Sequence, residues 1–111
     1  MSRFILSVIL LIIVSSQAIS QSIDSAVTRT FANKMKDSLS LTRGQADSIF
    51  RIFRASRIEK RQVWSQYRAS GDLQKRMLQE DNRRDSLIKT IIGDEKYTLY
   101  MQRRWHFLTS N

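Results

Sequence analysis

The residues that could do chemistry in this chain are few, and none stands in a catalytic arrangement. The sequence has one histidine, His106, and no cysteine, so it lacks a thiolate and the further ligands that a metal site needs. No serine has a recognisable histidine and acid partner, and no glycine-rich phosphate loop is present. Asp81 and Asp85 lie one helical turn apart, but two arginines between them favour a solvated ion-pair network over an acid–base pair. We therefore expect no enzymatic activity, no cofactor and no metal site.

Positive charge is the other chemistry that the chain offers. It carries 19 Lys and Arg against 10 Asp and Glu, a net charge of +9, which favours acidic partners. At about 100° per residue, four arginines of the second predicted helix form one stripe, with Phe50 within it and Ile58 just past it. An exposed patch of this mixed kind would be a binding surface. Packing of Phe50 and Ile58 against the first or last helix is favoured instead, because a short helical chain needs every apolar contact. The candidate residues for binding a client or partner are Phe50, Arg54, Arg57, Ile58, Arg61 and Arg68.

The N-terminal residues 1–20 have the layout of a secretory signal peptide. Arg3 precedes an apolar run from Phe4 to Val14, and small and polar residues follow. A membrane span needs about 20 apolar residues, so an uncleaved anchor is the less favoured interpretation. Cleavage after Ser20 is preferred to cleavage after Ala18. The signal peptide predicts export, and nucleic acid is then a poor partner because it is scarce outside the cytoplasm.

Residues 21–111 are long enough for one small domain, and their composition predicts an all-α fold. The segment has no cysteine for a disulfide and no proline, and it is rich in strong helix formers. So small a chain buries only about 60–65% of its unfolded surface. We therefore expect its stability to come from good helix packing or from association with another chain, of which a homodimer is the obvious form. Two Gly-Asp pairs, Gly71-Asp72 and Gly93-Asp94, indicate helix boundaries, since glycine suits a left-handed helix end and aspartate suits the next N-cap.

Hydrophobic periodicity predicts about four helices. In the second, Ile49, Phe53, Val63, Trp64 and Tyr67 fall on one apolar side. The polar middles of the second and third helices would face each other in an antiparallel hairpin, where Lys60 or Arg61 could pair with Glu80, Asp81 or Asp85. The last helix presents a face with Tyr97, Tyr100, Met101, Trp105 and Leu108. The expected ranges are Ile23 to Leu39, Thr42 to Tyr67 or Ala69, Asp72 to about Ile92, and Asp94 to about Leu108.

The clearest start signal is Leu41-Thr42-Arg43-Gly44-Gln45. Thr42 stands at the N-cap with Gln45 three residues later, which is the pattern of a capping box. This pentad resembles the LTxxQ motif of the Spy/CpxP family of small periplasmic helical proteins. The family usually carries a second copy before its last helix, and here that position reads Ile92-Gly93-Asp94-Glu95-Lys96-Tyr97, a degraded copy.

The resemblance implies a hooked antiparallel helical hairpin that dimerises into a curved shape. Members resemble ATP-independent holdase chaperones or accessory regulators of an envelope-stress sensor kinase, with a basic and apolar concave face for the client or sensor. Leu41, Thr42 and Gln45 would then be structural. Metal-binding relatives use several histidines, so the single His106 makes that branch a poor match.

Three functional hypotheses follow. The first is a periplasmic interaction protein that binds unfolded or acidic clients, or the periplasmic domain of a sensor kinase, through the basic stripe. The alternative is a basic amphipathic protein that binds anionic membrane or lipopolysaccharide surfaces, for which Arg103, Arg104, Trp105 and Phe107 would be suited. A metal sensor or small enzyme is the third, and it needs side chains that the sequence lacks.

Overall fold

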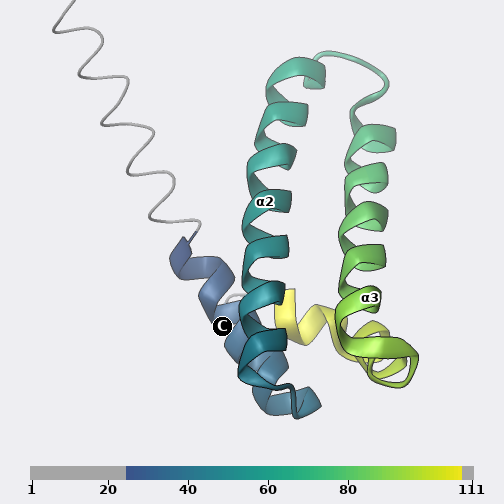
Figure 1. Ribbon diagram of the computed structural model, residues 1–111. Helices are drawn as coiled ribbons and strands as arrows, with labels where there is room; N and C mark the ends of the chain where they lie inside the picture. The colour runs from purple at the N-terminus through teal and green to yellow at the C-terminus, as the bar shows by residue number, and fades with distance from the viewer. Residues whose placement is uncertain (1–24, 109–111) are drawn as a thin grey trace, which may run out of the picture.

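The computed structural model describes residues 25–108, and within this range all regular structure is helical (Figure 1). The all-α class predicted from the composition is therefore confirmed. The signal peptide, its cleavage site and the start of the first predicted helix at Ile23 lie outside the described residues. The elements are a first helix over residues 25–39, α2 over Arg43–Tyr67 and α3 over Leu73–Leu108.

α3 changes direction at Gly93, which divides it into segments 73–92 and 94–108. Gly93 has φ 84° and ψ 168°, a backbone region that is essentially open to glycine alone. The two segments match the predicted third and fourth helices. Gly71 has no positive φ, so its predicted left-handed helix end is wrong. The chain turns there through Ser70, whose hydroxyl accepts the amide of Asp72 at 3.1 Å.

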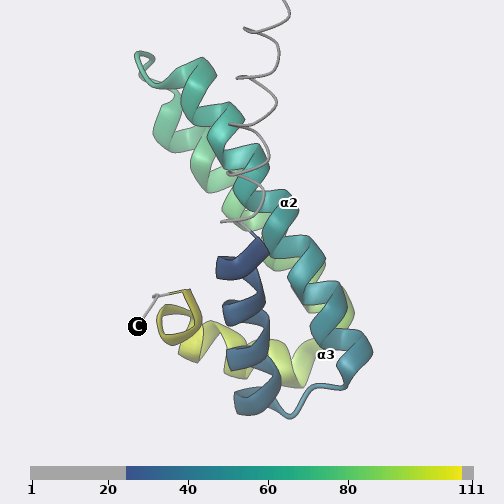
Figure 2. The same ribbon diagram turned by 90° about the vertical axis from the view of Figure 1, so that its left-hand side faces the viewer.

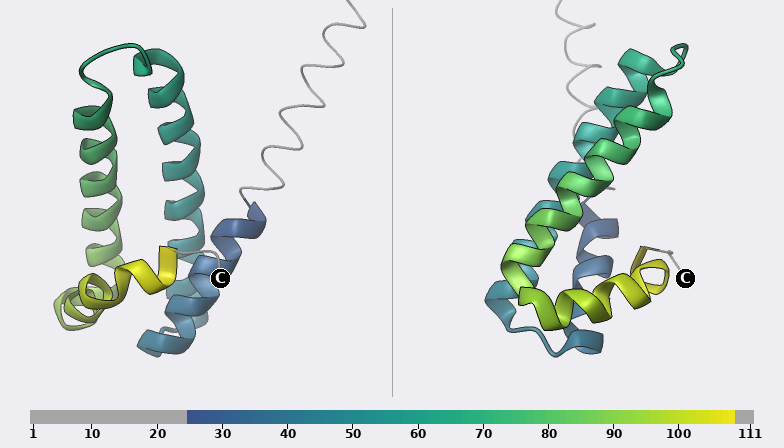
Figure 3. Two further views of the ribbon diagram at one scale, coloured as in Figure 1. Left: turned by 180° about the vertical axis from the view of Figure 1, so that it is seen from behind. Right: turned by 90° about the vertical axis from the view of Figure 1, so that its right-hand side faces the viewer.

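The elements are arranged around α2. Segment 73–92 returns beside α2 in the opposite direction, and the first helix lies against the lower half of α2 (Figure 1). Segment 94–108 then turns back across the lower ends of the other helices (Figures 2 and 3). The predicted ion pair across the polar middles is present between Lys60 and Asp81.

The hydrophobic core lies at the lower end, where all these helical stretches meet. Phe31, Met35 and Leu39 recur at steps of four along the first helix and are buried together. Phe31 meets Phe53 of α2 edge-to-face, with ring centroids 5.7 Å apart. The buried apolar cluster comprises Phe31, Ala32, Met35, Leu39, Leu41, Ile49, Phe53, Ile88, Ile92, Tyr100 and Phe107.

The turn between the first helix and α2 is closed by the last segment. Ser40 has φ 54°, and the amide of Leu41 donates to the carbonyl of Lys36 at 3.1 Å, as in a Schellman helix end. Lys96 donates to the Ser40 carbonyl at 2.9 Å and Arg103 donates to the Ser38 carbonyl at 3.1 Å. Two cations of segment 94–108 thus bind the carbonyl end of the first helix, where positive charge is stabilising.

Two tryptophans are placed differently from the prediction. Trp64 was expected on the packed side of α2 but its residue is 53% exposed, because the upper half of α2 meets only one other helix. Trp105 was expected on the apolar face of the last segment but is 75% exposed, and Phe107 packs in the core instead.

Candidate functional site

The capping box predicted at the start of α2 is present. Thr42 Oγ1 accepts the amide of Gln45 at 3.1 Å, and Gln45 Oε1 accepts the amide of Thr42 at 3.0 Å. Gln45 also donates from Nε2 to the carbonyl of Ile91 at 3.2 Å. Leu41 is buried in the core just before the cap. Gln45 therefore joins the start of α2 to the end of segment 73–92, Thr42 caps α2, and Leu41 packs in the core.

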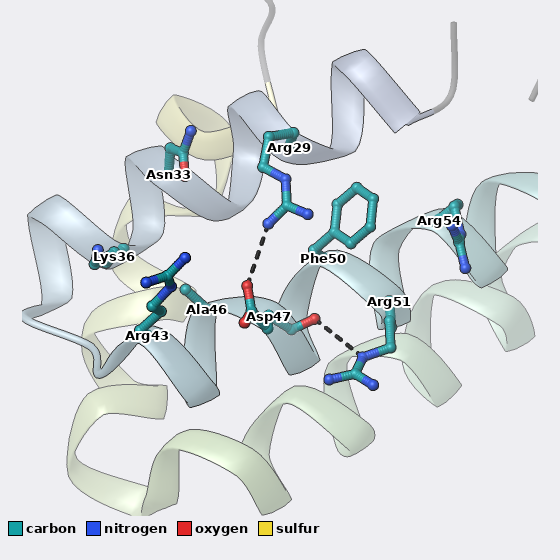
Figure 4. Close-up of a pocket in the computed structure, with 9 residues that line it drawn as sticks. All are labelled: Arg29, Asn33, Lys36, Arg43, Ala46, Asp47, Phe50, Arg51 and Arg54. Carbon is teal, nitrogen blue, oxygen red and sulfur yellow. Dashed lines mark hydrogen bonds and ion pairs between the residues drawn. The ribbon is translucent and has the colours of Figure 1, made fainter. Parts of the chain in front are cut away.

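A groove of about 700 Å³ lies between the first helix and the lower half of α2 (Figure 4). Lys36 and Arg43 stand at one end, and Arg51 and Arg54 at the other. We call it the basic groove, because five cations and one carboxylate line it. Its lining residues are Arg29, Asn33, Lys36, Arg43, Ala46, Asp47, Phe50, Arg51 and Arg54.

The middle of the basic groove is held by contacts between its own residues. Arg29 lies 3.3 Å from Asp47, and its guanidinium carbon lies 3.9 Å from the centroid of the Phe50 ring. Arg54 lies over the same ring at 5.3 Å. Phe50 is half-buried and packs against the core, as the packing interpretation expected. Its ring contacts the guanidinium groups of Arg29 and Arg54.

The other candidate residues of the α2 stripe lie further along the helix. Arg61 and Arg68 are exposed, whereas Arg57 and Ile58 are half-buried. Arg57 and the buried Ser56 line a separate cavity of about 180 Å³. The Ser56 hydroxyl is buried without a hydrogen-bond partner in residues 25–108. The structure thus brings Phe50 and Arg54 into the basic groove and leaves the rest of the stripe outside it.

Residues 57–79 form a two-helix projection that we call the arm. None of these residues is buried, although the range contains several apolar side chains. Trp64 is 53% exposed and Leu78 58% exposed. Six basic residues and two acidic residues accompany them. The half-buried apolar residues beyond Ile58 are Val63, Tyr67, Leu73 and Met77.

A buried polar network joins the two segments of α3. Asp85 Oδ1 accepts from the Tyr100 hydroxyl at 2.8 Å and from Arg84 Nε at 3.1 Å. Its other oxygen accepts from Arg104 at 3.0 Å. The network was expected to be solvated, and this is wrong for Asp85 and Arg84, which the returning segment buries.

The network also sets the protonation of its members. Burial raises the pKa of the Tyr100 hydroxyl above its ordinary value, with the Asp85 charge and hydrogen bond adding to the effect. Burial opposes the charged form of Arg84, but its anionic neighbours, Asp85 and Asp81 among them, outweigh burial, so the pKa of this guanidinium is raised. Tyr100 therefore donates to Asp85 as a neutral hydroxyl, and Arg84 stays a cation.

The described residues show little else that could hold a ligand by chemistry. Within residues 25–108, no group of three or more His, Cys, Asp or Glu is placed to hold a metal ion. His106 is exposed, with its ring beside Phe107 at 5.8 Å. No helix in the described part is both long and apolar enough for a membrane crossing. Of the residues suggested for a membrane surface, Arg103 and Arg104 bond to other helices and Phe107 is buried.

Comparison with known proteins gives no relative. No family model, no curated protein and no solved structure matches the chain.

Proposed function

We propose that this chain is an interaction protein of the periplasm that holds unfolded or acidic segments of client proteins without ATP. The observation that carries the proposal is the arm: residues 57–79 contain exposed Trp64 and Leu78 but bury no residue. A helix pair that leaves such side chains exposed is suited to cover them with a partner's apolar surface. The mechanism needs binding and release only, and no catalytic group.

The charges of the arm support the same partner class. Arg61 and Arg68 are exposed on the stripe of α2, and basic residues outnumber acidic ones over residues 57–79. Long-range attraction would bring an acidic or unfolded chain to the arm, and apolar contact would then retain it. Weak contacts of this adaptable kind suit many clients.

The resemblance to the Spy/CpxP family adds three parts to the proposal. Export by a cleaved signal peptide would place the chain in the periplasm. A hooked hairpin would dimerise, which would extend the binding surface. A sensor kinase domain is the dedicated partner that would replace general clients in a regulator.

The test is suppression of client aggregation by residues 21–111, which include every described residue, at a near-stoichiometric ratio. The arm variant, Arg61→Glu with Arg68→Glu, reverses two exposed charges of the arm. The groove variant, Arg43→Glu with Arg51→Glu, is its matched control, because it reverses two exposed charges at the groove.

The native chain and the groove variant should protect the client, whereas the arm variant should lose most of its protection. Circular dichroism checks that all three remain helical. If the native chain gives no protection, general holdase activity is excluded. Recruitment by anionic vesicles would then favour the membrane-binding alternative.

A further inference from the structure

We propose that the basic groove is a binding site for an extended acidic peptide segment, rich in aspartate or glutamate. This site is separate from the arm, so the inference goes beyond the proposed function and holds whether or not the arm retains clients. It rests on three observations: the balance of charge, the spacing of the cations and the way in which two of them are held.

The charge of the groove is largely uncompensated. Five cations line it against one carboxylate, Asp47. Among the described residues, Arg29 alone of the five has an acidic partner within ion-pair distance. Arg51 bonds only to a backbone carbonyl of its own helix, and Arg54 contacts the ring of Phe50. An anionic ligand would complete ion pairs that the folded chain leaves unmade.

The spacing of the cations favours an extended ligand over a compact anion. Along α2 the groove runs from Arg43 to Arg54, about 16 Å at 1.5 Å per residue. An extended peptide rises about 3.3 Å per residue, so roughly five residues cover this length. Figure 4 shows the cations at both ends of the groove rather than converging on one point. A single phosphate could reach only one end.

The groove also holds part of its binding surface in place before a ligand arrives. The guanidinium carbons of Arg29 and Arg54 both lie over the Phe50 ring, at 3.9 Å and 5.3 Å from its centroid. Side chains restrained in this way lose less conformational freedom on binding. Asn33 adds an amide that can bond to a peptide backbone.

The experiment is fluorescence anisotropy with a labelled peptide of six glutamates and the native chain of residues 21–111. Hexaglutamine serves as the neutral peptide control. The groove variant, Arg43→Glu with Arg51→Glu, should raise the Kd for hexaglutamate by about tenfold or more. Glutamate at position 43 is in the first turn of α2, where negative charge is compatible with folding. The arm variant, which carries the same change in net charge, should leave the Kd within about twofold, because the arm retains a chain by apolar contact and hexaglutamate has no apolar side chain.

A second variant makes the test independent of misfolding, because it should bind more tightly. Asp47→Asn removes the carboxylate that competes for Arg29, so the Kd for hexaglutamate should fall by roughly threefold.

An equal loss of affinity for hexaglutamate in the groove and arm variants would show attraction by net charge alone and overturn the proposal. Competition by inorganic phosphate at matched ionic strength, as effective as by unlabelled hexaglutamate, would also overturn it. So would anionic vesicles that bind through Arg43 and Arg51 when hexaglutamate does not.

Discussion

Asp85 joins the two segments of α3 through bonds to three side chains. Both of its carboxylate oxygens are occupied, by Tyr100 and Arg84 on one and by Arg104 on the other. Arg84 is buried and has a second carboxylate partner in Asp81 at 3.1 Å, whereas the half-buried Arg104 pairs with Asp85. The network therefore holds segment 94–108 in its returned position.

Replacing this carboxylate by an amide should destabilise the fold strongly. We expect Asp85→Asn to lower the free energy of unfolding by about 3 kcal/mol, because Arg104 loses its carboxylate partner and the buried Arg84 keeps only Asp81. Tyr100→Phe, which removes one hydrogen bond, should cost only about 1 kcal/mol. Urea denaturation measures both, and equal small losses would show that the network contributes little.

Contacts between residues close in the sequence were predicted better than contacts between distant parts of the chain. The bonds between Thr42 and Gln45 follow from a spacing of three residues, and they were predicted. The second bond of Gln45, to Ile91, depends on how α3 returns, which no local pattern contains. The burial of Asp85 was missed for the same reason, since the segment that covers it comes from beyond Gly93.

At the scale of elements, Gly93 sets the path of α3. Its φ of 84° turns segment 94–108 back towards the first helix, where Lys96 and Arg103 bind the end of that helix. A side chain at this position would have free space, since no atom lies within 4 Å of where its Cβ would stand. The requirement for glycine is therefore one of backbone conformation alone.

Because glycine at position 93 is required for its backbone conformation and not for lack of space, a matched pair of alanine substitutions can test the requirement. Gly93→Ala should lower the free energy of unfolding by roughly 1–3 kcal/mol, because alanine rarely adopts this backbone conformation. Gly71→Ala, at the other Gly-Asp pair, also meets no atom but has no positive φ, so it should change stability by less than about 0.5 kcal/mol. Thermal unfolding of both variants measures these changes in stability, and equal effects would argue against a backbone requirement at Gly93.

The helix boundaries were predictable, whereas the buried faces were predictable only in part. Caps and glycines mark ends locally, and α2 ends at Tyr67 as predicted. Whether a face is buried depends on how many helices cover it. Trp64 shares its apolar side with Phe53, but Phe53 lies where several helices meet and Trp64 lies on the arm. The basic groove was missed because Arg29 and Lys36 come from a different helix from the stripe.

At the scale of the whole molecule, the lower end that holds the core, which we call the base, is joined to two different surfaces, the arm and the basic groove. The core and the polar network lie at the lower end, where four helical stretches meet. The arm projects from this base with its apolar residues uncovered by the rest of residues 25–108. The basic groove lies on the base beside the first helix. We expect the arm to retain unfolded chains and the groove to recognise acidic segments.

The most direct test of the client-holding function compares two exposed tryptophans. Trp64 lies on the arm and Trp105 on the base, with 53% and 75% of each residue exposed. Trp64→Ser and Trp105→Ser are measured side by side for suppression of client aggregation by residues 21–111. We expect Trp64→Ser to lose most of the protection and Trp105→Ser to keep it. Full protection by Trp64→Ser, or a loss confined to Trp105→Ser, would contradict the assignment of the arm as the client-binding surface.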